Sequence, residues 1–339
     1  MKQLQIIEEK PKLKDLIKIT RESGIPLLGL IHIGIIDRGS SLLQVRASTA
    51  CNMRCTFCST AANSYEMHPY NYEIELDYLM DWIKEVIKLK NNEVNQINID
   101  SVGEPTAYQK ITELIKECKK IPGIEIITMQ SNGTLLTKEK IKAMEEAGLN
   151  RINLSVHSLI SEQAKELFGN ENYNLEKIKE ICNIINDSKI ELNLTPVYLT
   201  GVNDHQIEKL IEFAKEINCK ISIQKYEVYK YSRKDKRVKE QNWFKFYRKL
   251  EELEKKHNYK LKLGPIDFKI KKSKRVPLIL SRGDVAIVEI IMPGWMKNEM
   301  ISKSNNRAIT IVDCNNKIGD KVRVKILETR DSIYIAKKV

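Results

Sequence analysis

The sequence predicts an α/β protein that carries a smaller all-β domain in its C-terminal part. Six short apolar runs between residues 42 and 226 are each followed by a stretch with helical periodicity, and after about residue 265 four closely spaced strand patterns occur without any helical pattern. Alternating strands and helices predict a mostly parallel sheet with helical crossovers, either an open doubly wound sheet or a barrel. Closely spaced short strands predict a small closed or nearly closed β-barrel.

The elements of the first region follow from the spacing of apolar residues. Strands are predicted where these residues form short runs, at 42–48, 96–101, 124–130, 151–156, 191–198 and 220–226. Helices are predicted where they recur every three to four positions, at 76–90, 111–120, 136–148, 175–187, 204–217 and 243–257. Thr137 is a suitable N-terminal cap for the third helix, and Gly148 is a suitable end for it. In either architecture, functional groups gather at the carboxyl ends of the strands.

The chain divides into four parts. Residues 1–40 are expected to form an N-terminal extension that packs on the main domain, which comprises residues 41–267. A basic tract at 268–280 is predicted to be a linker. Residues 281–339 are predicted to form the small barrel, with strands at 284–292, 306–313, 320–327 and 331–339.

Composition favours a globular protein that acts in a reducing compartment. Hydrophobic residues make up 42% and charged residues 30% of the 339 residues, and no apolar run is long enough to span a bilayer. The first residues contain no signal-peptide hydrophobic region, so we expect a cytoplasmic protein without a membrane segment. The formal net charge of +12 at pH 7 favours a polyanionic partner such as nucleic acid. Lysine enrichment typical of an AT-rich or thermophilic genome is the alternative explanation.

Three of the seven cysteines lie within eight positions, at Cys51, Cys55 and Cys58 in "CNMRCTFC". Structural zinc sites usually combine two pairs of ligands, and no second pair exists here. Thiolates at this spacing hold iron–sulfur clusters, and three of them leave one iron of a four-iron cluster open to another ligand. Structural cysteines with no metal remain the alternative.

The segment "CNMRCTFC" resembles the Cys-x3-Cys-x2-Cys signature of the radical S-adenosylmethionine (SAM) superfamily, including Phe57 before the third cysteine. The resemblance implies that the three thiolates hold a [4Fe–4S] cluster and that SAM chelates the fourth iron. It also implies that the reduced cluster cleaves SAM to a 5′-deoxyadenosyl radical. The resemblance covers about residues 40–265 and implies a partial (β/α)6 barrel.

Further segments at the ends of successive predicted strands resemble the family's cofactor-binding motifs. "SVGEPT" resembles the Gly-Gly-Glu segment, with Val102 in place of one glycine; "MQSNGTLL", "NLSVHS" and "TPVYLTGVND" follow the next three strands. Gly133 is expected to adopt a positive φ angle. The resemblance implies that the SAM-binding residues are Gly103, Glu104, Pro105, Ser131, Asn132, Ser155, His157, Pro196 and Val197.

The C-terminal strands resemble a TRAM domain, a small OB-like barrel found in RNA-modifying enzymes. OB-like barrels bind single-stranded or looped nucleic acid with basic grooves and stacking groups. A second basic tract with interleaved tyrosines occupies residues 224–239, although both tracts could also be solvated surface. The candidate RNA contacts are Lys225, Lys230, Arg233, Lys234, Arg237, Arg282, Trp295, Lys297 and Arg307.

These features together favour radical modification of a nucleotide in tRNA or another structured RNA. A C–H functionalisation such as base methylation is preferred over methylthiolation, because the resemblance implies that methylthiolation needs a second cluster and the other four cysteines lie far apart. A radical enzyme acting on a peptide or small metabolite, and a non-catalytic iron–sulfur sensor, remain the competing hypotheses. We expect a low-potential electron donor as a partner and a monomeric protein. The sequence does not predict a catalytic side chain or the target nucleotide.

Overall fold

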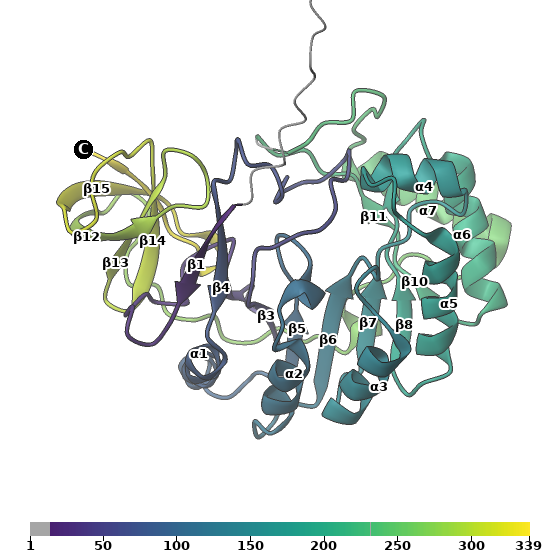
Figure 1. Ribbon diagram of the computed structural model, residues 1–339, viewed down its shortest axis with the longest axis horizontal. Helices are drawn as coiled ribbons and strands as arrows, with labels where there is room; N and C mark the ends of the chain where they lie inside the picture. Colours follow the sequence, from purple (N-terminus) through teal and green to yellow (C-terminus); the bar gives the residue numbers. More distant parts are fainter. Residues whose placement is uncertain (1–13, 231) are drawn as a thin grey trace, which may run out of the picture.

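A computed structural model describes residues 14–230 and 232–339 of the chain. Within these residues the strands form a seven-stranded sheet, a closed five-stranded barrel and two short two-stranded pairs (Figure 1). The barrel lies beside the edge of the sheet that contains the first strands of the chain. No helix in the described ranges combines the length and the apolar character needed to cross a bilayer.

The large sheet combines six parallel strands with one antiparallel edge strand. Its spatial order is β10 (Lys220–Ile221), β8 (Glu191–Leu194), β7 (Arg151–Leu154), β6 (Ile126–Ser131), β5 (Gln96–Ile99), β3 (Leu42–Arg46) and β2 (Gly34–Asp37). Strand β2 is the antiparallel one and pairs with β3. The six parallel strands coincide with the predicted apolar runs, so the predicted α/β class and partial (β/α)6 arrangement are confirmed.

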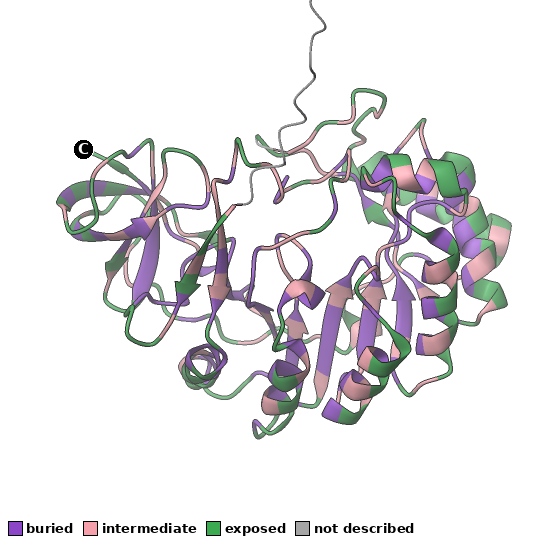
Figure 2. Cartoon of the chain, viewed as in Figure 1, coloured by how far each residue is buried: buried purple, intermediate pink, exposed green. Residues whose placement is uncertain are grey.

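Helices cover the outer face of this sheet (Figure 1). They are α1 (Leu76–Leu89), α2 (Ile111–Lys119), α3 (Lys138–Ala147), α4 (Ser161–Phe168), α5 (Leu175–Asn186), α6 (Asp204–Glu216) and α7 (Trp243–His257). Helix α3 begins and ends as predicted, because the Thr137 side chain accepts a hydrogen bond from Lys140 N at 3.2 Å and Gly148 has a φ of 101°. Figure 2 shows the expected burial pattern, with one side of most helices buried and the other exposed.

The inner face of the sheet is lined by polar side chains that hydrogen-bond across the strands. Side chains on a strand alternate between its two faces, so every second residue points inward. Thr128 Oγ1 donates to Asn98 Oδ1 at 2.7 Å, and Asn193 Nδ2 donates to Asn153 Oδ1 at 2.8 Å. Ser222 Oγ extends the row by donating to Asn193 Oδ1 at 3.0 Å. The inner face of the seven-stranded sheet is therefore a hydrogen-bonded polar surface. Closed (β/α) barrels are commonly filled with apolar side chains instead.

The described part of the predicted N-terminal extension, residues 14–40, contributes strands to the fold. Strand β2 completes the large sheet, and β1 (Asp15–Ile19) pairs in parallel with β4 (Tyr70–Ile74). Residues 1–13 of the predicted extension lie outside the described residues. Two further short strands, β9 (Val197–Tyr198) and β11 (Gln224–Lys225), pair beyond the ends of β8 and β10.

The C-terminal barrel has five strands, one more than predicted. These are β12 (Val285–Pro293), β13 (Met300–Ser304), β14 (Arg307–Val312), β15 (Lys321–Glu328) and β16 (Ile335–Lys338), and they close in the order β12-β13-β14-β16-β15. Strands β14 and β16 run parallel, whereas the other pairs are antiparallel. This arrangement confirms the expected small OB-like barrel. The missed strand, β13, is short and contains few apolar residues.

The barrel is docked on the main domain through the face that OB folds commonly use for nucleic acid. That face comprises the second and third strands and the adjoining loops. Here Ala308 N in the third strand donates to Leu28 O at 2.9 Å, and Tyr334 N donates to Gly29 O at 3.0 Å. Gly29 has a φ of 123°, and a Cβ added to it would lie 2.1 Å from Ala308 O. The usual binding face is thus covered by the protein itself.

The predicted linker at 268–280 also packs on the main domain. Ser41 N donates to Lys271 O at 2.8 Å, and Val276 N donates to Asp37 Oδ2 at 2.7 Å. Lys90 Nζ lies 2.7 Å from Asp37 Oδ1 in an ion pair with no exposed side-chain surface. These contacts fix the tract that joins the two domains against β2 and α1.

Candidate active site

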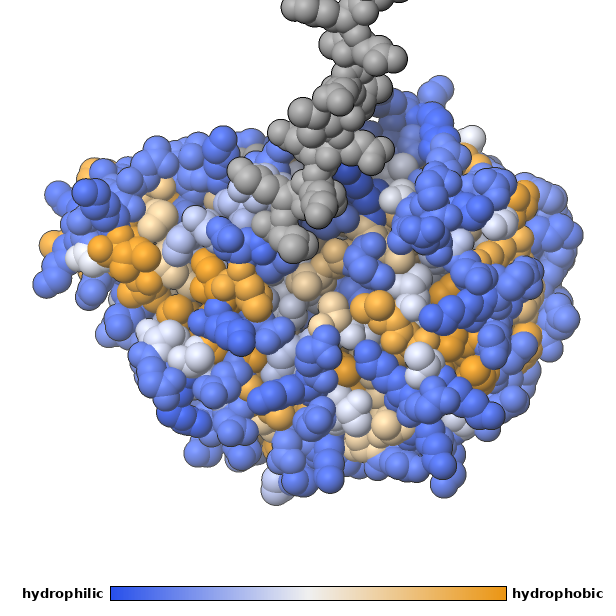
Figure 3. Space-filling view, in the orientation of Figure 1, coloured by the Kyte–Doolittle hydropathy of each residue, from blue (hydrophilic) through white to orange (hydrophobic). Residues whose placement is uncertain are grey.

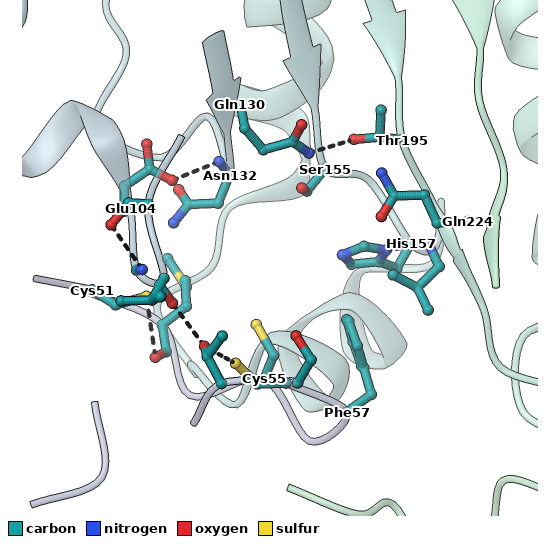
Figure 4. A pocket seen from close by; sticks show the side chains of 18 of the residues that line it. Cys51, Cys55, Phe57, Glu104, Gln130, Asn132, Ser155, His157, Thr195 and Gln224 are labelled. Atoms are coloured by element: carbon teal, nitrogen blue, oxygen red, sulfur yellow. Dashed lines mark hydrogen bonds between the residues drawn. The ribbon is translucent and has the colours of Figure 1, made fainter. Parts of the chain in front are cut away.

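A cavity of about 340 Å³ opens at the carboxyl ends of the parallel strands (Figure 4). Its lining brings together eleven residues that the sequence motifs predicted: Cys51, Cys55, Cys58, Gly103, Glu104, Pro105, Ser131, Asn132, Ser155, His157 and Val197. Pro196, which was also predicted, is buried outside this lining, and its carbonyl accepts a hydrogen bond from Gln224 N at 2.8 Å. The predicted position of the site at the strand ends therefore agrees with the structure.

The cysteine loop is shaped by the end of helix α4. Arg54 N donates to Phe168 O at 2.9 Å, and Thr56 N donates to Leu167 O at 3.0 Å. A Cβ added to Gly169 would lie 2.3 Å from Arg54 O, so the loop and the helix end approach as closely as glycine allows. The loop conformation is therefore set by backbone contacts with α4.

The three cysteines of this loop are half-buried in one wall of the cavity. Burial raises the pKa of Cys51 to about 12 and raises the pKa of Cys55 well above its ordinary value. Cys58 Sγ accepts a hydrogen bond from Ala61 N at 3.2 Å and lies 3.3 Å from Thr60 Oγ1. Such thiols lose their protons when a metal binds, because the positive metal ion stabilises the thiolate that burial alone disfavours.

A segment comprising residues 227–230 and 232–240, which we call the strap, folds over the outside of the cysteine loop. Ser232 Oγ donates to Ser59 O at 2.9 Å, and Arg233 N donates to Cys58 O at 2.9 Å. The Arg233 guanidinium donates to Asn63 Oδ1 at 2.6 Å and to Cys55 O at 3.4 Å. The strap thus places a guanidinium beside the three thiols.

Glu104 of the "SVGEPT" segment hydrogen-bonds to the "MQSNGTLL" segment. Its Oε1 accepts hydrogen bonds from Thr106 and from Ser131 Oγ, at 2.6 Å and 2.8 Å, and its Oε2 accepts from Asn132 N at 2.7 Å. Burial raises the pKa of this carboxyl, and these hydrogen bonds oppose the rise. Oε2 has a single donor among the described residues, so it keeps acceptor capacity toward the cavity.

Close packing explains the residue types around Glu104. A Cβ on Gly103 would lie 2.2 Å from Ala50 O, so the segment passes too close to the cysteine loop for any side chain. Val102, which departs from the family pattern, is buried, and its carbonyl accepts from Thr60 Oγ1 at 2.7 Å. Gly133 has a φ of 80°, which agrees with the predicted turn.

An aromatic group closes another side of the cavity. The His157 ring lies 4.7 Å from the Phe57 ring and 4.9 Å from the Phe168 ring, measured between centroids. Burial lowers the pKa of His157 to about 3, so this imidazole is neutral near pH 7. Its Nδ1 accepts from Val197 N at 3.1 Å, which leaves the proton on Nε2.

Sequence reasoning missed the polar inner wall of the cavity. Gln130 Nε2 donates to Thr195 Oγ1 at 3.0 Å, and Gln224 also faces the cavity (Figure 4). Gln130 precedes Asn132 by two positions, and Thr195 precedes Val197 by two. The alternation of side chains along a strand was therefore the signal that could have found them.

The residues present fit a [4Fe–4S] cluster and SAM. Three thiols share one wall with an adjoining cavity, and the Arg233 guanidinium beside them has no carboxylate partner in the described ranges. Among the described residues no three His, Cys, Asp or Glu side chains converge on one point, as a closed zinc site requires. In a cluster, different thiolates bind different irons. Cys51, Cys55 and Cys58 would hold the cluster, and the Glu104 segment, the turn at 131–134 and His157 would surround the cofactor.

The predicted RNA contacts divide into exposed and buried residues, and three of the predictions are wrong. Trp295 is 4% exposed because its ring stacks on His68. Arg307 is 5% exposed, and its guanidinium donates to Pro277 O at 3.2 Å. Lys225 is also buried, and its Nζ lies 3.4 Å from carboxylate oxygens of Glu227 and Glu240. The remaining predicted residues lie on the strap and the barrel: Lys230, Arg233, Lys234, Arg237, Arg282 and Lys297.

Comparisons with known proteins agree with the site. Residues 45–214 match the family model described as the radical SAM superfamily. An uncharacterized protein of Methanocaldococcus jannaschii is 35% identical, over 93% of this chain and 79% of that protein. The GTP 3′,8-cyclase of Aquifex aeolicus is 29% identical, over 56% of this chain and 58% of the cyclase. The chain thus spans little more than half the length of that cyclase.

The fold has a counterpart among solved structures. SuiB of Streptococcus suis, crystallised with its precursor peptide SuiA, superposes with a TM-score of 0.50 at 18% sequence identity. The superposition covers 71% of this chain and 49% of SuiB. At this identity the likeness concerns the fold alone.

The cysteine loop, the strand-end cavity and the family match define a cluster-binding enzyme that uses SAM. The chain belongs to the radical SAM superfamily, whose members use a [4Fe–4S] cluster and SAM.

Proposed function

We propose that the protein modifies a nucleotide of tRNA or another structured RNA by functionalising a C–H bond, as in methylation of a base. The observation that carries this proposal is a row of cations on the outer face of the C-terminal barrel. Lys321, Arg323 and Lys325 alternate along β15, and Lys337 on β16 pairs with Lys325. All four are exposed, and none has an ion-pair partner in the described part of the chain.

Such a row suits a nucleic-acid backbone. Alternate residues of a strand are about 7 Å apart, so the cations form a regular line of positive charge, in which only Lys321 has a carboxylate, that of Glu289, opposite it on the described part of β12. Phosphate neutralisation by lysine and arginine supplies most of the sequence-independent affinity for nucleic acid. The neighbouring strand β12 adds the exposed apolar side chains Val285 and Ile287, and Figure 3 shows apolar side chains gathered over the barrel. On this proposal the barrel is of the TRAM type. It binds RNA with the face formed by β15 and β16, because the face that OB folds commonly use packs on the main domain.

The cavity suits an uncharged polar ring better than a triphosphate. Lys225 is the one cation among the described residues that line it, and two carboxylates already accompany its ammonium group. A nucleoside triphosphate, such as the substrate in the Aquifex relative's name, would require unpaired cations. Gln130, Thr195 and Gln224 instead present amide and hydroxyl groups, which hydrogen-bond to the edges of bases.

The chain's own residues would bind and orient the target nucleotide and shield the reacting groups from water. When bound, the cluster and SAM supply hydrogen-atom abstraction from a C–H bond. Phe57, His157 and Phe168 form an apolar side of the cavity that excludes water from the reacting groups. The inner wall would hold the target ring in one orientation. The other cysteines, Cys118, Cys182, Cys219 and Cys314, are all buried away from the cavity lining, which favours C–H functionalisation over methylthiolation.

The test measures tRNA binding by anaerobically prepared, cluster-loaded protein over a series of salt concentrations. We expect the logarithm of the affinity to fall linearly with the logarithm of the salt concentration. Changing Lys321, Arg323 and Lys325 together to Glu should weaken binding and reduce the slope by about 0.7 to 0.9 for each phosphate that is no longer neutralised. The matched control changes Lys84, Lys88 and Lys116, which are exposed on α1 and α2, to Glu and should retain the original slope.

A second measurement identifies the product. RNA should stimulate the formation of 5′-deoxyadenosine, and mass spectrometry of nucleosides from cells with and without the gene should reveal one modified nucleoside. Affinity that does not change with salt, together with no stimulation by RNA, would refute the RNA substrate and favour a peptide or small metabolite.

A further inference from the structure

Arg233 is a half-buried guanidinium held against the cysteine loop. Its side chain donates to Asn63 Oδ1 at 2.6 Å and to Cys55 O at 3.4 Å, while its backbone N donates to Cys58 O at 2.9 Å. All three contacts go to uncharged acceptors. No carboxylate of the described residues pairs with this guanidinium.

Another arginine of the strap is arranged differently. Arg237 lies four positions further on, and its guanidinium pairs with Asp235 at 2.6 Å and also with Glu166. Asp235 and Glu166 neutralise Arg237, whereas Arg233 keeps its full charge. A partly buried cation without a counter-charge is costly, because water that would stabilise it is excluded.

The groups that could balance the charge of Arg233 are the three cysteines, which lie on the loop that Arg233 contacts. The Arg233 side chain donates to Cys55 O and its backbone N donates to Cys58 O, so the guanidinium lies against the loop that carries all three thiols. Thiolates that hold a cluster would provide the negative charge that the protein around Arg233 does not.

We infer that Arg233 raises the reduction potential of the bound cluster by acting as its fixed positive counter-charge. Reduction adds one electron, so the reduced cluster carries one more negative charge than the oxidised cluster. A nearby cation stabilises the more negative form, and net charge and hydrogen bonding around a cluster are known determinants of its potential. Arg233 thereby acts through the cluster as a positioning and tuning residue. This inference concerns the cluster alone and does not depend on the RNA substrate.

The experiment titrates the cluster-loaded protein anaerobically with dithionite, which supplies the single electron, and follows the reduced cluster by electron paramagnetic resonance. In Arg233→Gln we expect the equilibrium constant for reduction to fall about tenfold, which is a shift of about 59 mV to more negative potential for a one-electron couple. Arg233→Lys keeps the charge and should retain most of the wild-type potential. Arg237→Gln removes the same formal charge from the same strap and should leave the potential unchanged.

A second variant tests the charge without removing the arginine. Asn63→Asp places a carboxylate at the position that now accepts the 2.6 Å hydrogen bond from Arg233. It should neutralise the guanidinium and lower the potential in the same direction as Arg233→Gln. The potential is read from whatever fraction of molecules holds a cluster, so reduced cluster loading does not obscure the result. Potentials unchanged in both Arg233→Gln and Asn63→Asp, or shifted equally in Arg233→Lys and Arg233→Gln, would overturn the inference.

Discussion

The indole ring of Trp295 stacks on the imidazole ring of His68, with the ring centroids 3.9 Å apart and the planes inclined by 14°. This contact joins the C-terminal barrel to the cysteine loop, because His68 Nε2 lies 2.8 Å from Thr60 O and Thr60 Oγ1 lies 3.3 Å from Cys58 Sγ. The barrel therefore supports the metal-binding loop through His68 and Thr60.

Replacing Trp295 by Ala should destabilise the protein and loosen the cysteine loop. Removing a buried tryptophan typically costs about 3–5 kcal/mol of unfolding free energy. We expect a lower denaturant midpoint and less iron retained per chain after gel filtration. Trp243, which is 52% exposed on α7, provides the control, and Trp243→Ala should change both quantities much less. Equal effects of the two substitutions would contradict the proposed link.

Replacing Cys55 by Ala should remove the cluster. Three thiolates are the available protein ligands, and losing one leaves two irons of the cluster without protein attachment. Iron content, absorbance near 400 nm and formation of 5′-deoxyadenosine should fall together to background. Cys118→Ala is the control, since this thiol is buried in α2 and lies outside the cavity lining. A Cys55→Ala protein that retained iron and SAM cleavage would disprove the ligand assignment.

Replacing Glu104 by Gln should weaken SAM binding by about tenfold or more. The amide group of Gln would point a donor at Asn132 N or at Thr106 N, which are themselves donors, and an unsatisfied buried polar group costs about 1–3 kcal/mol. Equilibrium dialysis with the cluster-loaded protein measures the affinity. Glu125→Gln, at an exposed position before β6, should leave the affinity unchanged. Unaltered SAM affinity in Glu104→Gln would exclude this segment from the cofactor site.

Acid should destabilise the folded protein through its buried histidines. Burial lowers the pKa of His68 from 6.5 to about 4 and that of His32 to about 3. The unfolded chain therefore binds protons below pH 6.5 that the folded protein does not, and stability is lost as pH falls from about 6.5 toward these lowered values. One pKa unit corresponds to about 1.4 kcal/mol, so His68→Gln should reduce the loss between pH 7 and pH 4 by on the order of 3 kcal/mol. Denaturant midpoints across that range provide the measurement, and an unchanged pH dependence would contradict this role of His68.

The main sheet was predictable because the helix-facing residues of its strands are apolar and buried, so each strand appears in the sequence as a short apolar run. The strands β1, β2 and β4 were not predicted, because each depends on a partner that the local sequence does not identify. Strand β1 at Asp15–Ile19, for example, pairs with β4 at Tyr70–Ile74. Helix α4 was not predicted either, although the helical spacing of Ala164, Leu167 and Phe168 was a local signal for it.

The candidate site was predictable where motifs follow the strands, because the carboxyl ends of parallel strands meet at one edge of the sheet. The exposure of individual residues was not predictable. Trp295 and Arg307 suit RNA contacts by residue type, but the docking of one domain on another buries both. That docking involves residues nearly 300 positions apart, such as Arg38 and Asp331, whose charged groups are 2.8 Å apart.

The close approach of Gly29 to Ala308 gives this two-part architecture a sequence marker of its own. With a Cβ only 2.1 Å from the Ala308 carbonyl, no other residue fits at this position without separating the two domains. A relative that keeps the three cysteines but has a larger residue there must seat its terminal barrel differently. This single position would therefore sort members of the family by how they are assembled, independently of the reaction that they catalyse.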